Sequence, residues 1–236
     1  MEISVIIPAY NEEKRILPTL EKVYDYFSRV QNMDFEIIVV DDGSKDNTEK
    51  VVKNFAKDKS KRVKFIKHKE NKGKGTAVKT GMMEAKGEYI LFSDADLSTP
   101  IEEFGKLKKA IDRGYDIAIG SRGLPESKIV IPQPWYRRYI GKIFPLIVRI
   151  IVMKNFRDTQ CGFKLFKKKI AKELFANLIT SGFAFDVEIL YKALKKEYNV
   201  KEIPVKWYNY KESKVSILKA PFNMLKEIIK IKRKVK

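Results

Sequence analysis

Residues 89–102 read YILFSDADLSTPIE, and this stretch joins a short apolar run to two aspartates and a helix start. The run at residues 89–92 has the length and composition of a buried strand. Thr99 is followed by a proline and then by Glu102, which is a capping-box spacing with proline at the first helical position. We therefore expect a helix to begin here, with Thr99 as its cap. A strand that leads directly into a helix is typical of an α/β fold.

Four further apolar runs, rich in β-branched residues, alternate with amphipathic segments along the chain. They lie at residues 3–7, 36–40, 63–67 and 116–120. This rhythm predicts βαβ units, and so a mostly parallel central sheet flanked by helices. Beyond them, the pattern predicts a helix over residues 185–196 and a strand over residues 202–207.

The length and composition predict one main domain with a short C-terminal helix. The 236 residues, 44% of them hydrophobic, are enough to bury a full core. We place this domain at residues 1–215 and a basic amphipathic helix at residues 216–236, where six of the last eleven residues are basic. Residues 134–153 combine aromatic, basic and apolar side chains, which predicts a helix at a membrane interface. A core-packed helix with a solvated basic face is the alternative for both segments.

The charge and the rare residue types narrow the class of protein. Lys and Arg number 49 against 30 Asp and Glu, a net charge of +19. This excess favours an anionic partner, which could be a phosphorylated ligand, an acidic lipid surface or nucleic acid. The single Cys161 and the single His68 exclude an intrachain disulfide and any metal site built from several cysteines or histidines.

Neither a secretory signal nor a membrane span is visible in the sequence. The opening residues MEISVIIPAY lack the pattern of a signal peptide. The most apolar stretch, residues 143–153, is far shorter than a membrane span. We expect a peripheral protein on the cytoplasmic face of a membrane, with no transmembrane helix.

Polar side chains follow four of the predicted strands, at the edge of a parallel sheet where ligands gather. Taken alone, each of these strand ends is equally well explained as ordinary turn chemistry. The four ends are Pro8-Ala9-Tyr10-Asn11-Glu12, Asp41-Asp42-Gly43-Ser44, Asp94-Ala95-Asp96 and Ser121-Arg122.

Asp94 and Asp96 carry the clearest chemical argument. Alternate residues of an extended segment point the same way, so the two carboxylates would lie beside one hard cation. A Mg²⁺ or Mn²⁺ ion held there would bridge a diphosphate and offset the charge of a departing nucleotide. The alternative is that Asp96 or Ser98 caps the next helix, and it is weaker because Thr99 already accounts for that cap.

The segment at residues 71–76, NKGKGT, is glycine-rich but matches neither of the two common phosphate-binding fingerprints. Its glycines would let a base or a phosphate approach the backbone before a helix that starts at Thr76. A plain loop into a helix explains them nearly as well, and both interpretations stay open. A dinucleotide-binding fold is disfavoured because the first strand ends without a glycine fingerprint.

Five segments, in this order and spacing, resemble the family-two glycosyltransferases over roughly residues 3–215. They are VIIPAYNEE, VVDDGSKDNT, NKGKGTAVKTGM, YILFSDADLSTP and IGSR. Two more, FRDTQCGFKLF at residues 156–166 and FAFDVEIL at residues 183–190, are similar to the polyprenyl-phosphate branch of that family. This branch contains dolichyl-phosphate glucosyltransferases and dolichol-phosphate mannose synthases. DADLSTP is more similar to the glucosyltransferases, because mannose synthases more often have glutamine where Ser98 stands.

The resemblance implies a GT-A fold, which is a Rossmann-like α/β fold, and a nucleotide-sugar donor. It implies one group of positions around the nucleotide base and ribose, and another around the metal and diphosphate. The first group is Pro8, Ala9, Tyr10, Glu12 and Asp42, with Asp41 and Gly73 as second choices, and the second group is Asp94 and Asp96.

The resemblance also implies an acceptor phosphate held by basic side chains. Arg122 matches the family motif. Arg137 or Arg138 supplies a second arginine by approximate spacing, with an exposed basic helix face as the alternative. Lys211 and Lys214 resemble a basic loop that closes over the donor in relatives, where arginine often stands in place of Lys211. Lysine cannot make the bidentate fork of arginine, so this departure leaves the role of the loop open.

The implied activity is the inverting transfer of a hexose, glucose from UDP-glucose, to dolichyl or another polyprenyl phosphate at a membrane surface. The attacking phosphate oxygen is ionised at neutral pH, so catalysis would rest on positioning and on electrostatic stabilisation of the leaving diphosphate. We expect Asp96, Arg122 and Asp186 to carry it. Asp186 stands where other family members have a base for hydroxyl acceptors. Here it would orient the sugar or the acceptor arginines, or act as a satisfied structural carboxylate.

Other functions stay open from the sequence alone. A mannose synthase that uses GDP-mannose would share the mechanism. A transferase for a soluble saccharide would need Asp186 as an essential base, and a sugar nucleotidyltransferase would release pyrophosphate. The charge also fits a basic nucleic-acid-binding module. That function leaves the acidic strand ends unexplained, so we expect no nucleic-acid partner.

Overall fold

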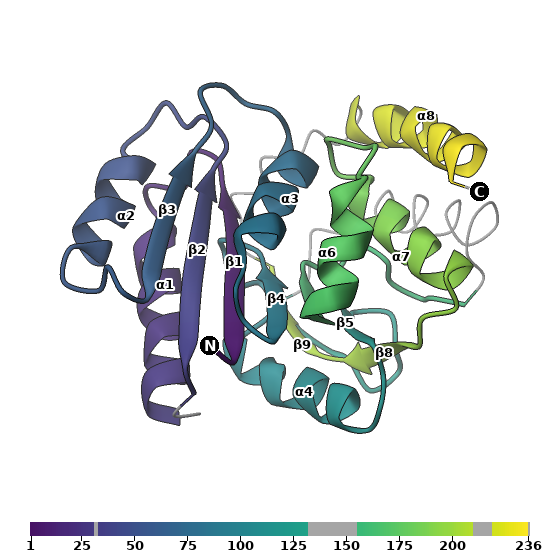
Figure 1. Cartoon of the computed structure of the whole chain (residues 1–236), viewed down its shortest axis with the longest axis horizontal. Helices are drawn as coiled ribbons and strands as arrows, with labels where there is room; N and C mark the ends of the chain where they lie inside the picture. The colour runs from purple at the N-terminus through teal and green to yellow at the C-terminus, as the bar shows by residue number, and fades with distance from the viewer. Residues whose placement is uncertain (31–32, 132–154, 210–218, 236) are drawn as a thin grey trace.

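Each of the five apolar runs forms a strand of one central sheet (Figure 1). The computed structural model describes residues 1–30, 33–131, 155–209 and 219–235. Within them, the sheet has seven strands in the order β3-β2-β1-β4-β7-β5-β8. These strands are β1 (Ile3–Ala9), β2 (Phe35–Asp41), β3 (Val63–Lys67), β4 (Tyr89–Ser93), β5 (Ile117–Ser121), β7 (Phe163–Lys167) and β8 (Val200–Pro204).

The sheet is mostly parallel, as predicted, with one reversed strand. β1 pairs in parallel with β2 and β4, β2 with β3, and β5 with β8. β7 lies between β4 and β5 and runs antiparallel to both. The sequence did not reveal this strand, because its run FKLFK is short and has Lys164 at a buried central position.

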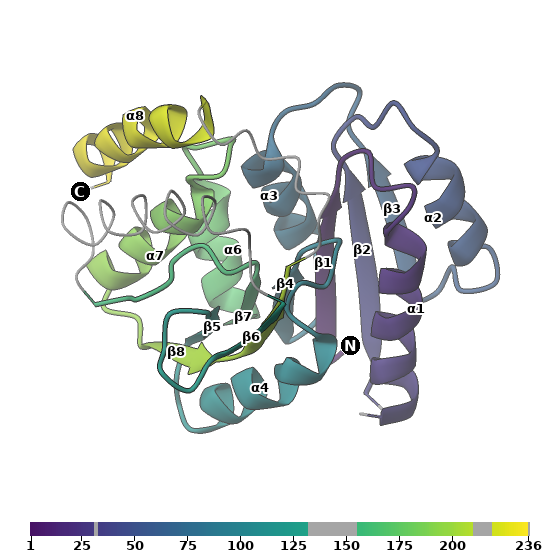
Figure 2. The ribbon, with the colours of Figure 1, turned by 180° about the vertical axis from the view of Figure 1, so that it is seen from behind.

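Helices cover both faces of the sheet (Figure 1 and Figure 2). Strand side chains alternate between the faces, so Val5 and Ile7 pack with α1, α2 and α4, whereas Ile6 packs with α3, α6 and α7. The helices are α1 (Ile16–Asp25), α2 (Thr48–Ala56), α3 (Lys74–Glu84), α4 (Phe104–Asp112), α6 (Lys168–Ala176), α7 (Phe185–Lys195) and α8 (Lys219–Lys234). A π-helical turn, η1 (Tyr26–Val30), extends α1, and a 3₁₀ turn, η2 (Ile101–Glu103), precedes α4. No helix among the described residues is long and apolar enough to cross a membrane.

The predicted strand over residues 202–207 is two strands in two different sheets. β8 ends at Pro204, and β9 (Lys206–Tyr208) pairs in parallel with β6 (Lys128–Ile131) to form a small second sheet. Val205 is the point of exchange, since its N–H donates to the Ser121 carbonyl while its own carbonyl accepts from Lys128. The prediction of one strand was wrong because the change of pairing partner, from β5 to β6, involves residues that are distant in the sequence.

The helix expected after Asp96 is present, but its predicted cap is wrong. The helical region starts with η2 at Ile101, and Pro100 stands before it in an extended conformation. The Thr99 side chain makes no capping hydrogen bond; its Oγ1 lies 3.5 Å from Cys161 Sγ in the buried interior. The argument that Thr99 accounts for the helix start therefore fails.

The predicted C-terminal helix is present as α8, and one of its faces packs on the domain. Ile228 and Ile231 are fully buried, and Ile228 belongs to the same core cluster as residues of α6 and α7. Ile229 is 45% exposed, and Lys226, Lys230 and Lys234 are also exposed. The alternative of a core-packed helix therefore holds for the buried face. The other proposed interface segment, residues 134–153, lies outside the described residues.

The buried face of α8 predicts unequal effects of two neighbouring substitutions. Ile228→Ala should lower the free energy of unfolding by about 2–5 kcal/mol, because Ile228 is fully buried in the core cluster that it shares with α6 and α7, and its truncation opens a cavity there. Ile229→Ala, on the exposed side of the same helix, should change it by less than about 0.5 kcal/mol. Urea denaturation of both variants checks this, and equal effects would contradict the packing of α8.

Candidate active site

The ends of β1, β2, β4 and β5 meet at one edge of the sheet, as the parallel pattern predicted. Asp42 N donates to the Ala9 carbonyl across 2.8 Å, which ties the ends of β2 and β1 together. Thr19 Oγ1 on α1 donates to the Ala95 carbonyl across 2.7 Å and so holds the turn after β4. Arg122 after β5 lies within electrostatic range of Asp94. The structure therefore brings the predicted acidic strand ends and Arg122 into one site.

The loop after β1 is bonded to the loop after β2. Asn11, in a left-handed conformation with φ of 55°, donates its N–H to Ser44 Oγ, and Glu12 N donates to Thr48 Oγ1. The Glu12 carboxylate makes a bidentate pair with Arg15, with both distances 2.7 Å. Among the predicted nucleotide residues, Pro8 and Ala9 are buried within β1, and Tyr10 is the first exposed one.

The two aspartates after β2 have different surroundings. Asp42 accepts the backbone N–H groups of Lys72 and Gly73 at 3.0 and 2.8 Å, and its Oδ1 lies 2.8 Å from His68 Nδ1. Its carboxylate therefore shapes the glycine-rich loop. Asp41 is fully buried and accepts Ser44 N through Oδ1, while its Oδ2 has no hydrogen-bond partner among the described residues.

The glycines of the NKGKGT segment allow another part of the protein backbone to lie close to them. Gly73 has φ of 94°, and a Cβ there would lie 2.5 Å from the Ser181 carbonyl oxygen. A Cβ on Gly75 would lie 2.9 Å from the carbonyl oxygens of both Ser181 and Gly182. The described contacts thus favour the plain-loop interpretation of this segment, with α3 starting at Lys74.

Asp94 and Asp96 lie close together, but in a turn. β4 ends at Ser93, and Leu97 has φ of 46°, so the prediction of an extended segment was wrong. The side chains of Asp94 and Asp96 are 31% and 26% exposed. Burial and the nearby charge of Asp94 raise the pKa of Asp96, and Asp96 Oδ1 accepts Ser98 N at 2.9 Å.

This acid pair suits a divalent cation of the hard class. Carboxylate oxygens are the ligands that Mg²⁺ and Mn²⁺ prefer, and the repulsion between Asp94 and Asp96 is what a cation would relieve. In the part of the chain that is described, no group of three or more His, Cys, Asp or Glu side chains is placed to hold a metal.

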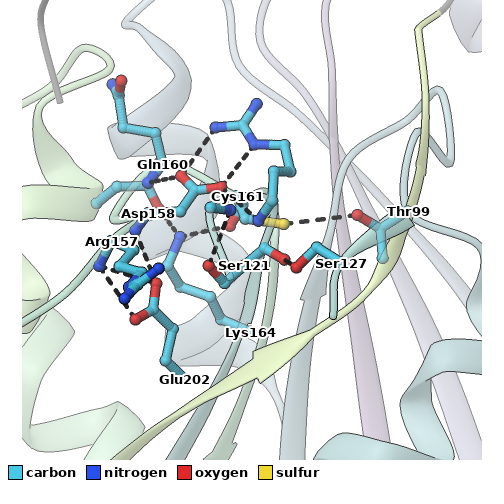
Figure 3. Close-up of polar contacts among 12 residues, drawn as sticks. Thr99, Ser121, Ser127, Arg157, Asp158, Gln160, Cys161, Lys164 and Glu202 are labelled. Carbon is cyan, nitrogen blue, oxygen red and sulfur yellow. Dashed lines mark hydrogen bonds and ion pairs between the residues drawn. The ribbon is translucent and has the colours of Figure 1, made fainter. Parts of the chain in front are cut away.

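Arg122 is held by Asp158, a residue that the sequence analysis did not single out. Figure 3 shows Asp158 among its polar contacts. Arg122 Nε and Nη2 donate to Asp158 Oδ2 and Oδ1 at 2.6 and 2.9 Å, and the Arg122 backbone N–H donates to Oδ2 at 3.0 Å. Burial alone would raise the pKa of Asp158, but the Arg122 guanidinium outweighs it and brings the pKa to about 2. Both groups are therefore charged at neutral pH.

Asp186 lies in a charge cluster with Lys164, Lys74 and Asp94, in which Asp186 and Lys164 are buried and the other two are partly exposed. Lys164 Nζ lies 2.5 Å from Asp186 Oδ1 and 2.6 Å from the Cys161 carbonyl oxygen. Lys74 Nζ lies 2.7 Å from Asp94 Oδ1, and both Asp94 and Asp186 raise the pKa of Lys74 against the opposing effect of burial. The four charges alternate in sign, so each is compensated by a neighbour. Of the two roles left open for Asp186, this contact favours that of a satisfied carboxylate.

Gly162 is a further residue that the site requires. Asp94 N donates to the Gly162 carbonyl at 3.1 Å, and a Cβ on residue 162 would lie 1.9 Å from Asp94 Oδ2. Asp158, Gly162 and Lys164 all belong to the segment FRDTQCGFKLF. The signal available in the sequence was the presence of an aspartate, a glycine and a lysine in this largely apolar segment. The remaining predicted residues, Arg137, Arg138, Lys211 and Lys214, lie outside the described part of the chain.

Comparison with known proteins finds one family along most of the chain. The family model described as glycosyl transferase family 2 matches residues 4–175. The dolichyl-phosphate beta-glucosyltransferase of Dictyostelium discoideum is 35% identical, over 98% of this chain and 73% of its own length. The human protein of the same name is 37% identical, over 91% of this chain and 69% of its own length.

Solved structures share the fold at low sequence identity. Glucosyl-3-phosphoglycerate synthase of Mycobacterium tuberculosis, in complex with Mg²⁺ and uridine diphosphate, is 15% identical with a TM-score of 0.71, over 98% of this chain and 79% of its own. The mannosyltransferase PcManGT of Pyrobaculum calidifontis, in complex with GDP-Man and Mn²⁺, is 18% identical with a TM-score of 0.61, over 90% of this chain and 58% of its own. These likenesses confirm the predicted GT-A fold.

The close packing of Gly162 against Asp94 predicts a stability effect. Gly162→Ala should lower the free energy of unfolding by about 1–3 kcal/mol, because the added methyl group displaces a charged side chain and its loop. Gly105→Ala, within a helix, is the matched control, since the nearest atom that a Cβ there meets among the described residues is Tyr26 Oη at 4.0 Å. The control should be neutral or stabilising by up to about 1 kcal/mol. Chemical denaturation that finds the two variants equally stable would refute the close contact.

The single thiol should be unreactive in the folded protein. Cys161 is buried, and burial raises its pKa to about 11, so the thiol stays protonated at pH 8. A thiol reagent such as DTNB should label it only after denaturant unfolds the chain. Rapid labelling of the native protein would show that this part of the site opens readily.

Proposed function

The chain belongs to glycosyl transferase family 2 and is a glycosyltransferase, and on this premise we propose that it transfers glucose from UDP-glucose to dolichyl phosphate. The relatives that carry the name of this activity are similar along 91% or more of the chain in the two cases cited above. The observation that carries the proposal is the site itself. An acidic pair suited to a cation and an arginine suited to an anion lie at one sheet edge, where Asp94 bonds to Gly162 and Arg122 to Asp158 in the single segment that leads into β7.

On the donor side, the nucleotide would lie against the end of β1 and the loop after β2. Tyr10 is exposed there, next to Pro8, Ala9 and Glu12. Asp41 Oδ2 is buried and has no hydrogen-bond partner among the residues that the structure describes. Asp42 and Gly73 would contribute through the loop that they fix together. A divalent cation, when bound, would be held by Asp94 and Asp96 and would supply positive charge beside the diphosphate.

On the acceptor side, Arg122 would bind the phosphate of the lipid. A phosphate oxygen is already ionised at neutral pH, so the reaction needs no strong base, and the protein has only to align it with the anomeric carbon. The contact between Asp186 and Lys164 supports this choice of acceptor. A soluble saccharide would need Asp186 as a free base, whereas Lys164 Nζ lies 2.5 Å from Asp186 Oδ1 and occupies that oxygen. Burial raises the pKa of Asp186, and the nearby ammonium of Lys164 reduces this rise.

The lipid acceptor requires a site near a bilayer. The exposed lysines of α8 and the net charge of +19 favour contact with an anionic membrane surface, and we propose a peripheral position there. Arg137, Arg138, Lys211 and Lys214 stay predicted contacts to the acceptor phosphate.

The direct test is transfer of labelled hexose to dolichyl phosphate in detergent, with UDP-glucose or GDP-mannose as donor, with and without Mn²⁺. We expect metal-dependent transfer from UDP-glucose. Asp96→Ala should abolish it, whereas Asp112→Ala, an exposed aspartate on α4, should leave it unchanged.

Each other outcome changes a different part of the proposal. Transfer from GDP-mannose alone would correct the sugar and keep the acceptor. Lack of lipid product from either donor would refute the acceptor. Full activity of a folded Asp96→Ala variant would refute the acid pair.

A further inference from the structure

The ion pair between Arg122 and Asp158 leaves part of the guanidinium for a ligand. A guanidinium has five N–H donors in a fixed planar fork. Asp158 takes Nε and one N–H of Nη2, and among the described residues no hydrogen-bond partner is found for Nη1. The Arg122 side chain is 30% exposed, whereas Asp158 is 5% exposed. The carboxylate therefore holds the inner edge of the fork, and the outer edge remains accessible.

Two further contacts restrain the arginine from other directions. Its guanidinium carbon lies 5.6 Å from the ring centre of Trp207 on β9, which supports the flat face of the fork. The turn around Arg122 is also fixed, because Ser127 Oγ donates to the Ser121 carbonyl (Figure 3) and Gly123 N donates to Ser121 Oγ. An arginine that is held at its backbone, face and inner edge loses little further freedom when it binds an anion.

Asp158 is itself fixed by the sheet. Glu202 on β8 accepts the backbone N–H of Asp158 at 2.7 Å and that of Arg157 at 3.0 Å (Figure 3). Gln160 N donates to Asp158 Oδ1 at 3.1 Å. Because β8 pairs with β5, and Arg122 directly follows β5, the two ends of this chain of contacts belong to neighbouring strands. The position of the fork is thus set by the sheet and not by a loop alone.

We propose that Asp158 is the positioning residue of the acceptor-phosphate site, which fixes the Arg122 fork so that its outer donors meet the phosphate. This inference rests on the proposed function and deepens it. The carboxylate also offsets the charge of Arg122, so the guanidinium binds the phosphate through directed hydrogen bonds more than through net charge. Loss of Asp158 would leave a mobile arginine, and the acceptor would then bind in less productive orientations.

The test separates the acceptor from the donor by steady-state kinetics with dolichyl phosphate and UDP-glucose. Asp158→Asn should raise the KM for dolichyl phosphate by roughly 10-fold or more, the effect of losing one hydrogen bond to a charged group, with the KM for UDP-glucose within about 2-fold of wild type. Asp116→Asn is the matched control, because Asp116 pairs with Lys167 at the opposite end of β5. The control should leave both KM values unchanged.

A double variant shows whether Asp158 acts through Arg122. In an Arg122→Gln background, adding Asp158→Asn should change the KM for dolichyl phosphate by less than about 2-fold, since the pair acts as one unit. If Asp158→Asn does not fold, the Glu202→Gln variant replaces it in the test. Glu202→Gln should raise the KM for dolichyl phosphate by a smaller factor than Asp158→Asn.

The failures of the two proposals are distinct. An unchanged acceptor KM in Asp158→Asn, an equal rise of both KM values, or a further rise in the Arg122→Gln background would overturn the role of Asp158 while the wild type still makes lipid-linked glucose. A wild-type enzyme that transfers no glucose to dolichyl phosphate would overturn the proposed function, and this inference with it.

Discussion

β7 is the element on which the site depends, because it enters the sheet between β4 and β5 in the reverse direction. A strand that runs opposite to its neighbours begins at the edge where theirs end. The segment that leads into β7 therefore passes across the carboxyl ends of β4 and β5. This segment places Gly162 against Asp94 and Asp158 on Arg122, and β7 itself places Lys164 beside Asp186. One reversed strand thus links the proposed cation site to the proposed phosphate site.

Charge compensation is the second constraint on this edge of the sheet. The protein carries a net charge of +19, yet the buried charges of the site alternate in sign. Burial of an unpaired charge costs roughly several kcal/mol, and each of these groups has an oppositely charged neighbour within 2.7 Å. The excess positive charge lies elsewhere, on exposed side chains such as the lysines of α8. A bound diphosphate and phosphate would add further negative charge at this edge, which agrees with the cation proposed at Asp94 and Asp96.

The C-terminal helix is joined to the site by one turn of chain. Backbone N–H groups of Gly182 and Ala184 bond to Glu227 on α8, where burial raises the pKa of the carboxyl. The same turn lies against Gly73 and Gly75 at the start of α3, next to Lys74. Packing of α8 therefore supports the loop that carries one of the four charges of the cluster, in addition to presenting basic side chains to solvent.

The sequence by itself determined the α/β class, five strands of the sheet, the family and the acidic strand ends, because these depend on local periodicity and on short motifs. The antiparallel β7, the exchange of strands at Val205 and the partners of Arg122 and Asp186 were not predictable in that way. Asp158 is 36 residues from Arg122, and Lys164 is 22 residues from Asp186. Periodicity reports which face of an element is buried, and it contains no information on which distant side chain lies opposite. Only the tertiary structure decided how the charges pair, because a buried charge takes the partner that the packing of the strands places beside it.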